Sequence, residues 1–284
     1  MSPNSQTALT RADRALTTPR PLVALSAEYA PATRIPAHRH HKHQLLYAVR
    51  GVMTVTAEAG RWVVPPQFAV WVPAGMTHTV LAHGALSMRT LWVAPDVSRR
   101  LPRLCGVHLV TPLMRELVLR AMELPRLYNE KGADGRLVAV LLDELAALSP
   151  APLHLPWPRD PRAQRVARAL QRRPANARTL AEWARSVGGG ERTLARLFAR
   201  ETGLSFGAWR RRMRLLHAVE RLGAGVSVTA VSLDCGYESA SAFIGAFRRE
   251  LGVSPARFAA SGWGDRRPRQ ADEGGVRPLA ASSA

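Results

Sequence analysis

Several histidines in the first third of the chain are spaced so that they could bind a metal ion or a small molecule together. His38 and His40 stand two positions apart, so on a β-strand both would point from the same face. Gln44 follows four positions after His40, and His78 comes after the tight-turn sequence Pro73-Ala-Gly75. Three imidazole rings and one amide oxygen could hold a divalent metal ion. These four side chains are therefore candidates for a metal or effector site.

Two other uses of these histidines stay open. They could belong to a pocket for a small molecule without a metal, in which Trp71 and His78 are expected to contact the ligand. His41 and His43 crowd the same segment, which also allows an exposed histidine run with loose affinity for nickel or zinc. No carboxylate stands among the candidate ligands, so the residue types do not decide between these uses.

Arginines are the second set of candidate functional residues. The 284 residues carry a formal net charge of +19, and lysine occurs only at Lys42 and Lys131. Residues 162–262 contain 18 arginines against seven carboxylates. Clustered positive charge favours contacts with nucleic-acid phosphates, because binding releases condensed counterions.

The histidines lie in a region of alternating hydrophobicity that runs from about residue 23 to residue 93. Glycine and proline separate its apolar runs, which is typical of short strands joined by turns. Many short antiparallel strands predict a sandwich or a barrel. The expected strands cover residues 44–49, 53–57, 61–64, 68–72 and 86–93.

Helical periodicity follows over residues 111–124 and 136–148, and the second of these segments has an apolar stripe from Leu137 to Leu148. Residues 149–161 contain five prolines, which is a composition typical of a linker.

The arginine-rich region contains a helix–turn–helix pattern. A short amphipathic helix is expected from Thr179 to a turn at Gly188, with a second helix over residues 191–198. Thr179 and Glu182 have the spacing of a capping box, which defines the start of the first helix. This geometry can place the second helix in a DNA major groove.

The same pattern occurs again over residues 227–236 and 239–248. Ser227 and Ser239 are the N-cap candidates of this copy, and a helix starting near Ser205 is expected to join the two copies. Two units in one chain could occupy two successive major grooves without a dimer. We interpret the region as a reader of double-stranded DNA; the alternative is a helical domain with no role in DNA binding.

Cys105 and Cys235 are too few and too far apart for a disulfide framework. There is no signal peptide and no apolar run near 18 residues, so we expect a cytoplasmic protein without a membrane partner.

From about Ala27 to Phe258 the chain resembles the AraC/XylS family of bacterial transcription regulators. The stretch Glu201-Thr-Gly-Leu-Ser-Phe206 and the run from Gly236 to Pro255 are similar to the most specific signature of the family. The first half resembles the cupin sensor domain of the NimR-like subgroup, through the segments 38–48 and 70–78.

The resemblance implies positions that read bases. In the first unit these are Arg192, Ala195 and Arg196. An arginine can donate two hydrogen bonds to the O6 and N7 edge of guanine, although both arginines could instead contact phosphate. The corresponding positions of the second unit have short side chains, which suit shape or thymine-methyl recognition, while the two arginines after them would grip phosphate. The second-unit residues are Ala240, Ser241 and Gly245, followed by Arg248 and Arg249.

The resemblance also bears on the barrel. Metal-dependent cupin enzymes carry two histidines, a glutamate and a later histidine. Here Gln44 stands at the glutamate position and a glycine is missing from the second motif, which weakens an enzymatic interpretation and leaves metal binding open. In such regulators the helices after the barrel often form the dimer contact. By analogy the stripe over residues 137–148 is a dimer candidate, and packing on its own barrel is the alternative.

We therefore predict an α+β protein with two domains, which is not an enzyme and has no certain cofactor. It would regulate transcription by sequence-specific DNA binding and respond to a small-molecule effector, with a homodimer and, for an activator, RNA polymerase as further partners. The alternatives are a constitutive DNA binder whose barrel only dimerises, and a metal-dependent cupin enzyme fused to a DNA anchor. The expected segments are a disordered start (1–20), a cupin-like sensor barrel (21–100), a helical segment for possible dimerisation (101–148), a linker (149–161), the double helix–turn–helix domain (162–262) and a disordered tail (263–284).

Overall fold

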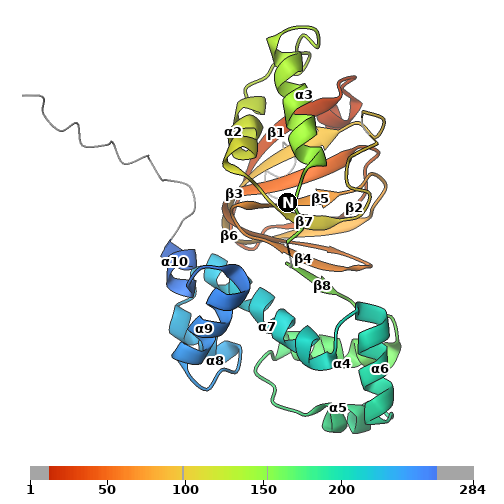
Figure 1. Cartoon of the computed structure of the whole chain (residues 1–284), viewed down its shortest axis with the longest axis vertical. Helices are drawn as coiled ribbons and strands as arrows, with labels where there is room; N and C mark the ends of the chain where they lie inside the picture. Colours follow the sequence, from red (N-terminus) through yellow and green to blue (C-terminus); the bar gives the residue numbers. More distant parts are fainter. Residues whose placement is uncertain (1–12, 98, 152, 261–284) are drawn as a thin grey trace, which may run out of the picture.

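A computed structural model describes residues 13–97, 99–151 and 153–260. A β-barrel with two covering helices lies on a separate helical domain (Figure 1). This arrangement confirms the predicted α+β fold class. The strands are β1 (Leu22–Tyr29), β2 (Arg34–His38), β3 (His43–Ala57), β4 (Gly60–Val64), β5 (Phe68–Val72), β6 (His78–Val93), β7 (Gly106–Leu109) and β8 (His154–Pro156).

The barrel is built around two long antiparallel strands, β3 and β6, which pair along most of their length. The sequence predicted separate strands over residues 44–49 and 53–57, because Gly51 lies between them. The chain instead continues through Gly51, whose φ is +82°, with a shift of register beside it. A side chain there would meet the carbonyl oxygen of Ala85 at 2.3 Å. Glycine therefore permits a bulge between close strands rather than ending one.

Helices α2 (Pro112–Ala121) and α3 (Ala133–Ala146) cover one face of the barrel. Tyr47 on that face shares a buried cluster with Leu141 and Leu145 of α3, whose side chains are completely buried. The apolar stripe over residues 137–148 was expected to form a dimer contact or to pack on its own barrel. For Leu141 and Leu145 the structure shows packing on the barrel.

The first described residues cover part of the barrel. Residues 13–17 are helical, and Ala15 is buried in a small cluster with Trp92. The buried ammonium of Lys42 donates hydrogen bonds to the carbonyl oxygens of Ala15 (3.3 Å) and Thr18 (2.8 Å). The prediction of disorder was wrong for residues 13–20, because these contacts hold them. The rest of that prediction, and the predicted tail from residue 263, lie outside the described residues.

The segment expected to be a linker is a structural part of the barrel. Its strand β8 pairs with β4, and both Leu155 of β8 and Leu153 just before the strand are buried. The indole Nε1 of Trp209 donates a 2.8 Å hydrogen bond to the carbonyl of Pro156. The composition of residues 149–161 was misleading, because proline is tolerated at the edge of a sheet and the leucines between the prolines supply core. Strand β7 likewise lies in a segment that was predicted to be helical.

The helical domain contains both predicted helix–turn–helix units, at opposite ends of α7 (Figure 1). Thr179 and Glu182 form the expected capping box, and the hydroxyls of Ser205, Ser227 and Ser239 each accept a hydrogen bond from the backbone N–H three residues later. No helix among the described residues is long and apolar enough to cross a membrane. The helices are α4 (Pro161–Arg172), α5 (Leu180–Ser186), α6 (Glu191–Thr202), α7 (Phe206–Gly223), α8 (Val228–Asp234), α9 (Ala240–Leu251) and α10 (Pro255–Ala260).

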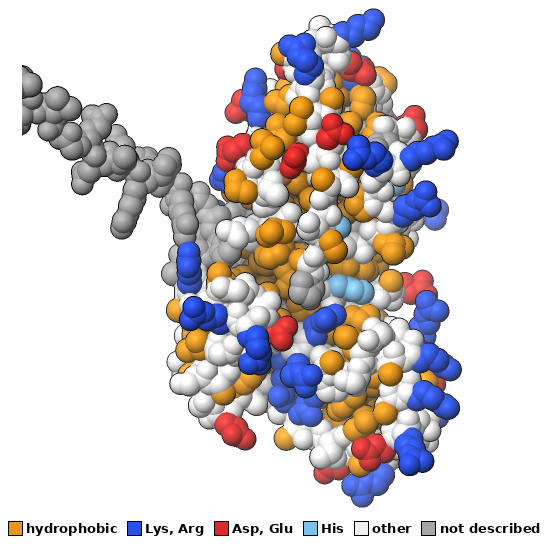
Figure 2. Space-filling model, viewed as in Figure 1, with side chains coloured by type: hydrophobic (Ala, Val, Ile, Leu, Met, Phe, Trp, Pro, Cys, Tyr) orange, Lys and Arg blue, Asp and Glu red, His pale blue; other side chains and the backbone are white. Residues whose placement is uncertain are grey.

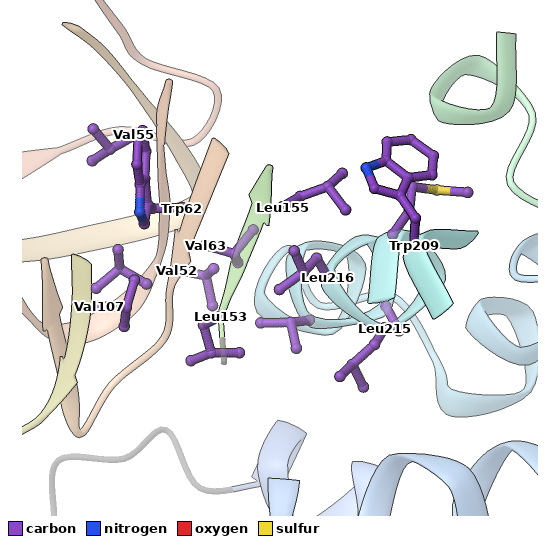
Figure 3. Close-up of a cluster of buried hydrophobic side chains, with 14 of the residues drawn as sticks. Val52, Val55, Trp62, Val63, Val107, Leu153, Leu155, Trp209, Leu215 and Leu216 are labelled. Atoms are coloured by element: carbon purple, nitrogen blue, oxygen red, sulfur yellow. The ribbon is translucent and has the colours of Figure 1, made fainter. Parts of the chain in front are cut away.

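A continuous cluster of buried apolar side chains joins the barrel to α7. Figure 3 shows Val52 of β3 and Leu155 of β8 on the side of the barrel that faces Leu216 of α7. A side chain at Gly223 would meet Val52 Cγ2 at 2.3 Å, so the end of α7 lies directly on the strand. The helix that joins the two units is therefore also the contact between the domains.

Candidate functional site

The first candidate site is the exposed face of α6. Arg192 and Arg196 are exposed and one helical turn apart, and Ala195 between them is partly buried. The opposite face is anchored by Leu194 and Phe198, which are buried. The two guanidinium groups therefore leave the same side of a helix whose other side is held by the core.

The corresponding face of α9 is different. Ala240, Ser241 and Gly245 are exposed, and a Cβ at Gly245 would meet nothing within 4 Å. The side chains on this face are short, so the helix backbone could approach a partner closely, but no side chain could form a bidentate contact. Arg248 and Arg249 follow in the last turn of α9, both exposed.

The two units are fixed relative to one another. Helix α7 has 18 residues, which corresponds to about 27 Å at 1.5 Å per residue. The Arg210 guanidinium donates to the carbonyls of Arg178 (3.1 Å) and Asn176, and Arg214 Nε donates to Pro174 O at 2.9 Å. These arginines clamp the α4–α5 loop onto α7. Sequence reasoning missed this role, because spacing alone does not distinguish a clamping arginine from a solvated one.

The second candidate site is the histidine cluster at one end of the barrel. His38 ends β2, His78 begins β6, and the two are paired in register. One ring nitrogen from each of His38, His40 and His78 lies within 4.8 Å of the others. The side-chain oxygen of Gln44 is 3.1 Å from Nε2 of His40. The structure thus brings together all four residues that the sequence singled out.

Backbone carbonyls orient the three rings. Each Nδ1 lies within hydrogen-bond distance of a carbonyl oxygen: Pro36 for His38 (2.9 Å), Lys42 for His40 (2.6 Å) and Met76 for His78 (3.0 Å). A carbonyl can only accept, so each Nδ1 carries the hydrogen and each Nε2 presents a lone pair. This arrangement is typical of histidines that bind metal through Nε2.

Burial favours the neutral form of two of these rings. His40 and His78 are buried, and burial lowers the pKa of His78 to about 4. Burial also lowers the pKa of His40, with smaller effects from its hydrogen bonds and neighbouring histidines. Neutral imidazoles are the form that ligates metal near pH 7.

The neighbours of the cluster correct two expectations. Trp71 does not line this site: it lies in the cluster under α2 and α3, and its Nε1 donates to Pro102 O at 2.7 Å. Successive residues of a strand face opposite sides, which separates Trp71 from the site. His43 also lies away from it, with its ring 5.1 Å from that of Trp71. No pattern in the sequence pointed to Trp92, whose indole meets the His40 ring edge-on with 4.5 Å between the ring centres.

A cupin barrel joined to two helix–turn–helix units defines a class of transcription regulators that bind DNA, and comparison with known proteins agrees. The family model described as a helix-turn-helix domain matches residues 183–261, and the one described as a cupin domain matches residues 25–94. Over 225 residues the chain is 36% identical to the HTH-type transcriptional regulator NimR of Escherichia coli K12, covering 79% of this chain and 82% of NimR. The chain belongs to the AraC/XylS family of transcription regulators.

Other relatives share smaller parts or less identity. The HTH-type transcriptional regulator RipA of Corynebacterium glutamicum is 38% identical over 104 residues, which are 37% of this chain and 31% of RipA. The structure of ToxT from Vibrio cholerae aligns with 85% of this chain and 98% of ToxT, at 7% identity and a TM-score of 0.36. The predicted family and the prediction of a DNA-binding transcription regulator are confirmed by the family models and the regulators that match.

Proposed function

We propose that this regulator reads bases mainly through its first helix–turn–helix unit and responds to a ligand in its barrel. The observation that carries the first part is the asymmetry between α6 and α9. Arg192 and Arg196 project from α6 and can each form two hydrogen bonds with a guanine, whereas the side chains at the corresponding positions of α9 are too short. The second unit then contributes shape recognition, with Arg248 and Arg249 on phosphate.

Arg196→Ala tests this assignment on the best duplex selected from a random pool. The variant is expected to lose about 1–3 kcal/mol of binding free energy and to accept other bases at one position. Affinities for the selected duplex and for its single-base variants, measured by fluorescence anisotropy, provide the comparison. Arg200→Ala is the matched control, because Arg200 lies on the same helix, is 69% exposed and pairs with Glu201. If Arg196→Ala weakens binding equally on every duplex, Arg196 contacts phosphate and not a base.

We also propose that the histidine cluster holds a divalent metal ion. One ring nitrogen from each of the three histidines lies within 4.8 Å of the others, and Nε2 of His78 is buried without a hydrogen-bond partner in the described part of the chain. The Gln44 oxygen and His40 Nε2 are both acceptors, yet they are 3.1 Å apart. A cation bound by both atoms would explain this short distance, and so would a Gln44 amide turned to donate its N–H to His40. His38, His40, His78 and Gln44 would hold the ion. A bound ion would supply a Lewis-acidic position to which an anionic effector could coordinate.

Titration of chelator-treated protein with Zn²⁺ tests the metal proposal. We expect one ion per chain to bind, and His78→Ala to weaken its binding by at least about 10-fold, because it removes one of three imidazole ligands. His41→Ala is the control, since His41 donates to Leu16 O on the surface. Calorimetry reports the affinity, and circular dichroism shows that the variants are folded. Equal affinity in the His78 and His41 variants would contradict the proposal.

The remaining partners are proposals of the same kind. A small-molecule effector would bind beside the histidines and Trp92, and the exposed Leu113 and Val140 of α2 and α3 would meet a second copy of the chain. RNA polymerase would be a partner if the protein activates transcription. The alternative of a constitutive binder predicts that no ligand of the barrel changes DNA affinity. The matching relatives are named as regulators, and among the described residues it is the histidine cluster that favours an enzymatic alternative.

A further inference from the structure

A basic cleft separates the two helix–turn–helix units. Its volume is about 1010 Å³, and it opens between the end of α4, the start of α5, the C-terminal half of α7 and the end of α8. Figure 2 shows Lys and Arg side chains gathered over the middle of the helical domain. The charged residues that line the cleft are Arg172, Arg173, Arg178, Glu182, Arg221 and Asp234.

The charges of the cleft do not cancel. Asp234 is paired with Arg221 at 3.1 Å, and Glu182 is occupied by its capping interaction with Thr179. Arg172 and Arg173 are exposed, and neither forms an ion pair within the described part of the chain. The cleft therefore presents unneutralised guanidinium groups.

A third guanidinium is held in place. The Arg178 guanidinium lies over the indole of Trp183, 5.1 Å from its ring centre. Arg178 immediately precedes Thr179, the N-cap of α5, and the first helix of a helix–turn–helix unit crosses the DNA backbone. Arg178 is therefore placed where a phosphate is expected to pass.

The walls of the cleft are rigid. Arg210 and Arg214 clamp the loop that forms one wall onto α7. Beside the cleft, Gly236 of the second unit lies against the lining residue Ala175, so closely that a Cβ on Gly236 would be 2.7 Å from Ala175 Cα. A cleft with fixed walls can present its charges without first ordering them, which lowers the entropic cost of binding.

We propose that this cleft receives the sugar-phosphate backbone of the DNA segment that joins the two engaged major grooves, with Arg172 and Arg173 as phosphate contacts. The inference rests on the proposed DNA reading by both units. Two recognition helices in successive grooves are about 34 Å apart along the duplex, so the segment between them must pass the gap between the units. Guanidinium groups match phosphate oxygens through paired hydrogen bonds. These contacts would fix the register of the duplex without reading its sequence.

The test compares the full-length protein with the Arg172→Ala/Arg173→Ala double variant. The control is Arg126→Ala/Arg136→Ala, which removes the same charge from exposed positions on the barrel domain. Affinity for the selected duplex is measured over a range of salt concentrations. We expect the slope of log K against log[salt] to become shallower by about 2 in the cleft variant, and to stay unchanged in the control.

A second duplex carries uncharged methylphosphonates at the phosphates between the two grooves. The unmodified protein should bind this duplex more weakly than it binds the natural duplex. The cleft variant should bind the two duplexes with equal affinity. An unchanged salt slope, or equal sensitivity of both proteins to the methylphosphonates, would overturn the proposal. So would binding of inorganic phosphate by the cleft when DNA affinity does not depend on the two arginines. Absence of any sequence preference in the unmodified protein would instead count against the proposed function. The cleft proposal would still be tested in that case, because the salt slopes of the two proteins can be compared on random DNA.

Discussion

Replacing Glu220 with alanine is expected to lower the Tm of the full chain by about 5–10 °C. Glu220 lies on α7 and is 5% exposed, yet its carboxylate accepts hydrogen bonds from two barrel residues, Thr54 (2.7 Å) and Arg61. His83 Nε2 is 3.7 Å from the same oxygen. Removing one partner of a buried charge pair costs about 3–5 kcal/mol. Arg61 is partly exposed, so solvent screening reduces this cost to about 2–3 kcal/mol, which gives the expected shift in Tm.

Differential scanning calorimetry measures the effect, and Glu58→Ala is the control. Glu58 is an exposed carboxylate in the β3–β4 turn, so its removal changes the charge equally without opening the domain junction. If both variants melt together, the Glu220 contacts do not hold α7 to the barrel.

Gly236→Ala is expected to weaken DNA binding on the order of 100-fold. The added Cβ would lie 2.7 Å from the Cα of Ala175, a backbone atom of the first unit, and the second unit must move away to make room. Two linked binding modules gain about 10²–10⁴ in affinity only while both engage together. A change in their relative position therefore removes most of the contribution of the second unit.

Gly188→Ala is a closely matched control for this prediction. Gly188 ends the first helix of the other unit with a φ of +72°, almost the same as the +71° of Gly236, but a Cβ there would meet nothing within 4 Å. Both variants carry the cost of a left-handed residue, about 1–2 kcal/mol. Only Gly236→Ala adds the contact between units. Equal DNA affinities in the two variants would contradict the account of the junction.

Local sequence signals predicted the elements of the helical domain well. Thr179 and Glu182 form the capping box that their spacing predicted, and Gly188 and Gly236 end helices in the left-handed region. These features depend on residues within a few positions of one another. The contact of Gly236 with Ala175 could not be predicted in this way, because it joins two distant segments.

The barrel shows the same limit. The two-residue spacing of His38 and His40 suggested that they share a strand face, but β2 ends at His38 and His40 follows it. Strand pairing, which the spacing does not reveal, places His78 beside His38. Composition failed for residues 149–161, where Leu155 and its neighbours form a strand that the prolines concealed. Trp71 was expected to contact the ligand but lies under α2 and α3, since its side of the sheet depends on the register of the strand and not on the type of residue.

The central claim, that the regulator places two helix–turn–helix units in successive major grooves, is tested most directly by footprinting of the selected duplex. Hydroxyl-radical and dimethyl sulfate footprints should show two protected segments about 10 base pairs apart on one face of the duplex. Guanine protection should be confined to the segment that Arg196→Ala exposes. A footprint with one protected groove, or with no protected bases at a concentration where the protein is fully bound, would contradict the account.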